Sequence, residues 1–143
     1  MRFMIIIRAS QRSESGEMPA EAAMAEMAAF HEELARAGVL VDASGLQPSS
    51  KGWRISYSVG ARSFVDGPFP ETKELIAGYT IIRVKSRQEA IDWTRLFPIP
   101  GCSGESPFIE VRQLFDLDEL GPSRAVERFR ALGVGTAGDA AAP

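Results

Sequence analysis

The first apolar run of the chain, RFMIIIR at Arg2 to Arg8, constrains the fold more than any other segment. Its apolar residues follow one another without alternation, which is typical of a strand that is covered on both faces. The run is far too short to cross a membrane, and polar residues interrupt the chain from Gln11 to Glu17. We therefore predict that this segment is the first strand of a sheet.

Two amphipathic helices are predicted. Pro19 suits the first position of a helix, and Gly38 suits the end of the alanine-rich segment from Ala20 to Ala37. At 100° per residue, five side chains of this segment fall on one side: Met24, Met27, Phe30, His31 and Leu34. Ser86 followed by Glu89 forms a capping box, which predicts a second helix from Arg87 to about Phe97.

The remaining segments complete a recognisable order of strands and helices. Further strands are predicted at Val39 to Pro48, Trp53 to Val59, Gly78 to Lys85 and Phe108 to Phe115, and a short extended piece, SFVD, follows Arg62. This order predicts an α+β, ferredoxin-like β-α-β-β-α-β fold, in which both helices cover one face of an antiparallel sheet. We expect a single domain over residues 1–132, including a third helix near Ser123 to Leu132, and a disordered tail over residues 133–143.

One face of such a sheet carries no helices. Four aromatic residues are expected to enlarge the apolar area there: Trp53, Tyr57, Tyr79 and Phe108. A monomer rarely exposes so large an apolar patch, so a homodimer that hides it is the predicted assembly.

Three motifs resemble the YCII-related family, in particular its branch named after the DGPF motif. They are GLQPSSKG (Gly45 to Gly52), DGPFPETKELIAGY (Asp66 to Tyr79) and KSRQEAIDW (Lys85 to Trp93), and the resemblance runs from Met1 to about Phe115. It implies a dimeric α/β barrel. Many relatives have no established activity, some look like small-molecule enzymes, and DGPF members are often encoded beside alternative sigma factors. In the wider family a histidine on the first helix and a buried aspartate are suggested as a catalytic pair, which implies His31 and Asp66 here.

The loop DGPFPETKE, Asp66 to Glu74, allows two interpretations. Pro68 and Pro70 fix two φ angles, and Gly67 permits a turn that a side chain would forbid. In a purely structural corner, the Asp66 carboxylate would accept hydrogen bonds from the amides of Gly67, Phe69 or a residue beyond Pro70. In a functional loop, the same stiffness would hold Asp66 and Glu71 at the mouth of a pocket.

Two functions follow from these residues. The first is a small-molecule enzyme that works by acid–base chemistry without a cofactor, with Asp66 as base or orienting carboxylate and His31 as its partner. Glu71, Lys73 and Arg54 would then contact the ligand, with Lys73 or Arg54 steadying an anionic substrate. The second is a non-catalytic ligand-binding or regulatory dimer, which the resemblance links to sigma-factor stress signalling. His31 itself allows a structural interpretation, as a partly buried histidine on the apolar side of its helix.

Other classes of function are disfavoured. The net charge of -3 and the scattered lysines and arginines argue against binding to nucleic acid. Cys102 is the only cysteine and His31 the only histidine, so no zinc site is expected, and Asp66, Glu71 and Glu74 are expected to be solvated charges rather than metal ligands. Phosphate-loop and dinucleotide fingerprints are missing from the sequence, and we expect a cytoplasmic protein that binds an unidentified small molecule.

Overall fold

The computed structural model describes residues 1–98 and 108–135 of the chain. Its strands are β1 (Arg2–Arg8), β2 (Leu40–Gly45), β3 (Trp53–Ser58), β4 (Ala61–Asp66), β5 (Ile76–Arg83) and β6 (Ile109–Gln113). Its helices are α1 (Gln11–Glu14), α2 (Glu21–Arg36), α3 (Arg87–Arg95) and α4 (Arg124–Ala131), with 3-10 turns η1 (Ser49–Lys51), η2 (Thr72–Glu74) and η3 (Leu117–Leu120). Within these two ranges, no helix combines the length and the apolar character needed to cross a membrane.

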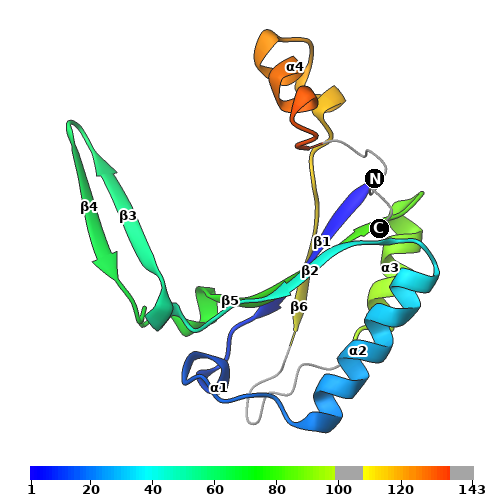
Figure 1. The fold of residues 1–143 in the computed structure, drawn as a ribbon, viewed down its shortest axis with the longest axis horizontal. Helices are drawn as coiled ribbons and strands as arrows, with labels where there is room; N and C mark the ends of the chain where they lie inside the picture. The colour runs from blue at the N-terminus through cyan, green and yellow to red at the C-terminus, as the bar shows by residue number, and fades with distance from the viewer. Residues whose placement is uncertain (99–107, 136–143) are drawn as a thin grey trace.

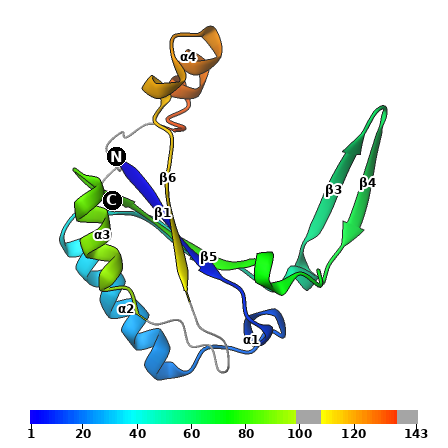
Figure 2. The ribbon, with the colours of Figure 1, turned by 180° about the vertical axis from the view of Figure 1, so that it is seen from behind.

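Four strands form the main sheet in the order β2-β5-β1-β6, and every neighbouring pair is antiparallel. Helices α2 and α3 lie on the same face of this sheet (Figures 1 and 2). The central path β1-α2-β2-β5-α3-β6 is therefore ferredoxin-like, and the predicted fold class is confirmed. The position of β1 between β5 and β6 explains why the RFMIIIR segment is apolar on both sides.

The core lies between the sheet and the two helices. Ile5, Leu34 and Ile82 have no exposed surface, and Phe30 of α2 meets Phe97 edge to face with ring centroids 5.1 Å apart. The cluster of buried residues at this place consists of Phe3, Ile5, Phe30, Leu34, Val39, Ile82, Val84, Ala90 and Phe97. The predicted apolar side of α2 is thus buried at its C-terminal end, while Met24 near the start remains 46% exposed.

The predicted chemistry is confirmed at the start of α3 and at the end of α2, whereas the prediction for the start of α2 is wrong: the helix begins at Glu21 after Ala20, and Pro19 lies outside it. The Ser86 hydroxyl accepts a hydrogen bond from the Glu89 amide at 3.1 Å, which caps α3. The Glu89 carboxylate reaches back to the amide of Lys85 at 2.8 Å. Gly38, with φ +71°, follows the last turn of α2, where a left-handed residue ends a helix most easily.

The strand predicted at Trp53 to Val59 does not join the main sheet, which is a correction. It pairs only with β4, from Trp53 opposite Asp66 to Ser58 opposite Ala61, and the two strands project from the body as a separate hairpin (Figure 1). The physical reason is local: SFVD belongs to a full strand, and a two-residue turn with Gly60 at φ +77° folds it back on β3. Trp53 and Tyr57 therefore do not lie on the sheet face where they were expected. We call this hairpin, Trp53–Asp66, the arm.

A small C-terminal lobe, formed by η3 and α4, lies beyond the end of β6 and away from α2 and α3 (Figure 1). Ser123 caps α4 by accepting from the Val126 amide at 3.1 Å, and Arg130 pairs with Asp118 at 2.8 Å. The Leu117 amide also donates to the carbonyl of Gly135 at 3.3 Å. Residues 136–143 of the predicted tail, and Cys102, fall outside the described residues.

The face of the main sheet opposite to α2 and α3 carries no helix, and we call it the open face. Because side chains alternate along a strand, Met4 and Ile6 of β1 point to this face, together with Tyr79 and Ile81 of β5. Their cross-strand neighbours on β6 are Glu110 and Arg112. The open face thus has an apolar centre and charged side chains along its β6 edge.

Candidate functional site

The DGPF motif forms the junction between the arm and the body. Gly67, joined to Pro68 by a cis peptide bond, passes so close to η1 that a Cβ atom at this position would lie 1.9 Å from the Ser49 carbonyl oxygen. No side chain fits at that distance, so the glycine of the motif is required by this backbone contact. The motif GLQPSSKG and the motif DGPF therefore meet in space.

Hydrogen bonds hold this junction together. The Gly67 amide donates to the Gly52 carbonyl at 3.0 Å, and the Phe69 amide donates to the Ser49 hydroxyl at 3.0 Å. The Ser49 amide in turn donates to the Glu14 carboxylate at 3.2 Å, and the Ser49 hydroxyl also binds that carboxylate. The expectation that Asp66 accepts from the amides of Gly67, Phe69 or a residue beyond Pro70 is wrong: the first two amides donate to these other acceptors, and no amide of the described residues donates to the Asp66 carboxylate.

Glu14 and Ser49 are residues that the sequence analysis missed. Glu14 lies in α1, a short helix within the polar stretch from Gln11 to Glu17, where no helix was predicted. Ser10 caps α1 by accepting from the Ser13 amide at 3.2 Å, and Ser13 binds back to the Ser10 amide. This serine pair was the available signal for α1, whereas nothing in the local sequence connects Glu14 to a residue 35 positions later.

Arg54 is held between two residues of the loop that follows the arm. Its guanidinium carbon lies 3.9 Å from the centroid of the Phe69 ring, and its Nη1 lies 3.2 Å from a carboxylate oxygen of Glu71. The two paired side chains remain 45% and 44% exposed. The structure thus brings together two of the predicted ligand-binding residues, but as partners of each other.

Asp66 lies on the other face of the arm. It stands opposite Trp53, whereas Arg54 stands opposite Val65, and neighbouring positions of a strand point to opposite faces. The Asp66 carboxylate is exposed and has no hydrogen bond or ion pair with any residue in the described ranges. Lys73 lies in η2, where its backbone carbonyl accepts a hydrogen bond from Arg8. The predicted site residues therefore do not form one cluster.

His31 is fixed by two hydrogen bonds inside the body. Its Nδ1 lies 2.8 Å from the Met27 carbonyl oxygen, and its Nε2 lies 2.8 Å from the Thr80 hydroxyl, which is 1% exposed. A neutral imidazole satisfies both contacts, since Nδ1–H donates to the carbonyl and Nε2 accepts from the hydroxyl. Neither His31 nitrogen bonds to Asp66, so His31 ties α2 to β5 in this arrangement.

A polar pair on the open face was also missed. The Tyr79 hydroxyl of β5 donates to Oδ2 of Asp42 on β2 at 2.9 Å, and Oδ1 of Asp42 accepts from the Ala43 amide at 2.9 Å. The hydrogen bond to Asp42, followed by the negative charge of that carboxylate, raises the pKa of Tyr79 above its ordinary value. The pairing of β2 with β5 is irregular between Leu40 and Asp42, and such bulges redirect side chains.

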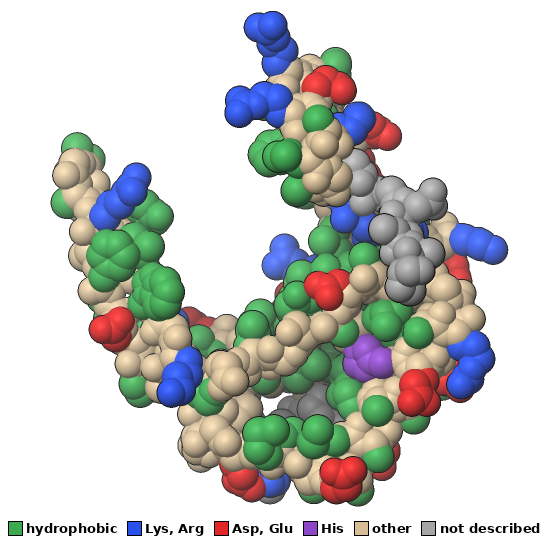
Figure 3. Space-filling view, viewed as in Figure 1, with side chains coloured by type: hydrophobic (Ala, Val, Ile, Leu, Met, Phe, Trp, Pro, Cys, Tyr) green, Lys and Arg blue, Asp and Glu red, His purple; other side chains and the backbone are tan. Residues whose placement is uncertain are grey.

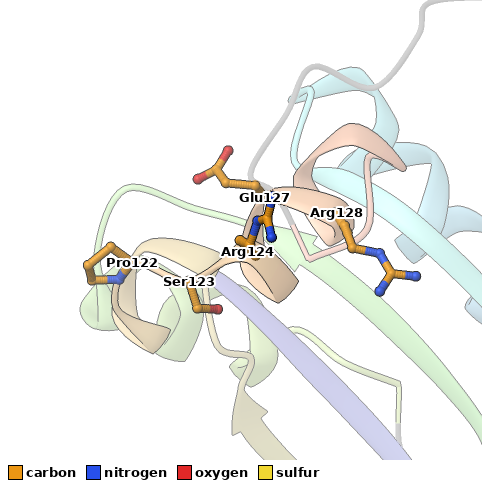
Figure 4. A pocket seen from close by; sticks show the side chains of 5 residues that line it. All are labelled: Pro122, Ser123, Arg124, Glu127 and Arg128. Carbon is orange, nitrogen blue, oxygen red and sulfur yellow. The ribbon is translucent and has the colours of Figure 1, made fainter.

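A ligand pocket beside α4 and a metal site are two further possibilities, and the structure favours neither. A surface depression of about 810 Å³ lies at the start of α4, but the side chains that line it splay in different directions: Pro122, Ser123, Arg124, Glu127 and Arg128 (Figure 4). It is formed by residues of the C-terminal lobe, whereas the predicted site residues lie in the arm and body. Over residues 1–98 and 108–135, no three His, Cys, Asp or Glu side chains gather closely enough to hold a metal ion.

Comparisons with known proteins give one strong match and two partial ones. The family model of the YCII-related domain matches residues 1–114. An uncharacterised protein of Rhizobium meliloti (strain 1021), R00369, is 33% identical over 75 residues, which are 52% of this chain and 60% of that protein. The match thus spans about three fifths of the relative's length.

One solved structure is similar at low identity. It is 5-chloro-2-hydroxyhydroquinone dehydrochlorinase from Burkholderia phenoliruptrix AC1100, in complex with 2,5-dihydroxybenzoquinone. The similarity has a TM-score of 0.40 and 13% identity, and covers 81% of this chain and 95% of the other. We draw neither fold nor activity from it.

Proposed function

The chain belongs to the YCII-related family, and from the structure of this member we propose that it works as a homodimeric binding module rather than as an acid–base enzyme. The observation that carries this proposal is the amount of apolar surface without a cover. Trp53, Tyr57 and Phe64 of the arm are 62%, 73% and 66% exposed. Large contiguous apolar surfaces on a folded chain mark sites of association.

The arrangement of titratable groups supports the same proposal. A proton-transfer site needs a base and an acid within hydrogen-bond reach of one substrate. His31 is occupied by Met27 and Thr80, and Arg54 is occupied by Glu71 and Phe69. The groups that were expected to share a substrate are thus engaged in separate structural contacts.

Sedimentation equilibrium at micromolar protein concentration tests the proposal. We expect a species of twice the chain mass of 15.5 kDa. On dilution we expect the dimer to dissociate into folded monomers. Circular dichroism at each concentration would show that the fold is retained. A monomer mass over the whole concentration range contradicts the proposal.

An acid–base enzyme is the second candidate, and one observation favours it: the Asp66 carboxylate has no partner within the described part of the chain. In this case Asp66 would act as the base, His31 as its partner, and Lys73 or Arg54 would steady an anionic substrate. Turnover of a candidate substrate that is lost in Asp66→Asn and in His31→Gln, with both variants folded, would favour this candidate over the binding module.

A further inference from the structure

The arm carries a largely apolar face, and within the described residues the contact over it comes from the arm itself: the Arg62 guanidinium carbon lies 5.5 Å from the centroid of the Tyr57 ring. Trp53, Ile55 and Tyr57 point to one side of β3, and Phe64 of β4 stands opposite Ile55 on that same side. We call this set, Trp53, Ile55, Tyr57 and Phe64, the aromatic face of the arm. A two-stranded hairpin alone is marginally stable in water, so a surface that packs against the aromatic face would stabilise the arm.

The junction sets the direction in which the arm projects. The contact of Gly67 with the backbone of Ser49, and the hydrogen bonds of Gly67 and Phe69, fix the two ends of the arm against η1. The arm then extends away from the sheet and leaves a hollow between itself and the C-terminal lobe (Figure 1). The side of the arm that faces this hollow carries hydrophobic side chains (Figure 3). The arm is thus held out in a defined direction rather than folded onto its own body.

The open face of the main sheet matches the arm in size. Each strand of the arm has six residues, or about 20 Å at roughly 3.3 Å per residue. Strand β1, which carries Met4 and Ile6 across the open face, has seven residues. The arm is therefore long enough to cross the open face of a second molecule.

Each of the two surfaces carries both signs of charge, with Asp66 and Arg62 on the aromatic face and Arg112 and Glu110 on the open face, so opposite charges can be paired between them. Asp66 lies at the base of the aromatic face and has no ion pair with any described residue. On the open face, Arg112 is 72% exposed and lies 3.8 Å from Glu110, a separation that leaves most of its donors available. Exposed guanidinium groups also pack favourably on aromatic rings, of which the arm presents three.

We propose that the arm docks on a second copy of this chain, with its aromatic face on the open face of the partner's sheet and Asp66 directed towards an arginine there. Three aromatic side chains of about 150–250 Å² each, roughly two-thirds exposed, offer about 300–500 Å². A stable interface needs about 800 Å² per partner. In a two-fold dimer each subunit gives one arm and receives one on its open face, and the two contacts together reach that size.

Photo-crosslinking tests this arrangement on the full chain. We replace Phe64 with p-benzoylphenylalanine, irradiate the protein at micromolar concentration and map the attachment by mass spectrometry. We expect a product of twice the chain mass, with the probe attached to β1 or β5 of the other copy. Attachment only within its own chain, or to the C-terminal lobe of the other copy, overturns the proposal.

A matched pair of variants provides the second measurement. Tyr57→Asp with Phe64→Asp should convert the dimer to a monomer at the same concentration, because it puts two charges on the aromatic face. Ser58→Asp with Ser63→Asp adds the same charge at the same diagonal spacing on the opposite face of the arm, and should leave the dimer intact.

The inference depends on the proposed dimer, but the two fail differently. A monomeric wild-type protein contradicts the proposed function. A dimeric wild-type protein that stays dimeric in Tyr57→Asp with Phe64→Asp, and gives no crosslink between copies, contradicts only the docking of the arm.

Discussion

Single side chains in this protein gain their roles from partners that are distant in sequence. His31 is a clear case, because the Thr80 hydroxyl that it contacts is 49 residues away. Sequence analysis placed His31 correctly near the apolar side of its helix, and it allowed both a structural and a catalytic role. The hydrogen bond to Thr80 supports the structural role, and the pairing of β5 within the sheet brings Thr80 beneath α2.

Tyr79 provides a prediction at the scale of a residue. Its neutral phenol donates to the Asp42 carboxylate, so ionisation would break that bond and place two negative charges together. With its pKa raised above the ordinary value of about 10, Tyr79 contributes stability that is complete below that pH. The contribution is lost as the pH rises through the raised pKa. In Asp42→Asn, the titration of Tyr79 should move to lower pH, as measured by the ultraviolet absorbance of the phenolate.

The assignment needs one control. The chain has two tyrosines, so the titration is best followed in a Tyr57→Phe background, where Tyr79 is the only phenol. An unchanged midpoint in Asp42→Asn would mean that the pair is not formed in solution.

At the scale of elements, the sequence correctly predicted several features that depend only on neighbouring residues. The capping serine of α3, the glycine after α2 and the apolar β1 were all identified from neighbouring residues, and all are confirmed. The alternation in WRISYS correctly predicted a strand, but alternation does not say which strand is its partner. Its pairing with β4 depends on the turn at Gly60, and the separation of the arm depends on the junction with η1.

The candidate site was predicted less well than the fold, because its contacts join residues that are distant in the sequence. The sequence analysis singled out the loop from Asp66 to Glu74, but it did not predict that the loop contacts Ser49 and, through Ser49, Glu14. Arg54 was selected for its charge and Glu71 for its place in the stiff loop, and the structure pairs them with each other. Asp66 was grouped with them, but the alternation of side chains along β4 turns it to the other face.

The close contact between η1 and the DGPF loop can be tested by mutation of Gly67. Gly67→Ala should lower the free energy of unfolding by about 1–3 kcal/mol, as overpacking typically does, because its Cβ would overlap the Ser49 carbonyl. Gly45→Ala is the matched control, since a Cβ there meets no atom within 4 Å, and it should change stability by less than about 0.5 kcal/mol. Urea denaturation of both variants measures the difference, and equal midpoints would show that η1 and the loop separate freely.

At the scale of the whole molecule, the described chain consists of a ferredoxin-like body, a projecting arm and a small C-terminal lobe (Figures 1 and 2). The main buried cluster lies in the body, the C-terminal lobe buries Leu117 and Val126, and the arm contributes no residue to either. An element that adds nothing to the core and exposes three aromatic rings is costly to keep in a monomer. Its exposure makes sense when the working unit contains two chains.

Removal of the arm tests this division of the molecule. Gly52 and Gly67 flank the arm and are already joined by a hydrogen bond of 3.0 Å, so a three-residue Gly-Ser-Gly linker can replace Trp53–Asp66 without moving either end. We expect the shortened chain to fold, because every core residue is retained, and to have the mass of a monomer, because the aromatic face is gone. Trp93, half-buried against the core, becomes the only tryptophan and reports on folding by its fluorescence, while light scattering gives the mass. A shortened chain that fails to fold would show that the arm stabilises the body, and one that folds as a dimer would show that the subunits meet through other surfaces.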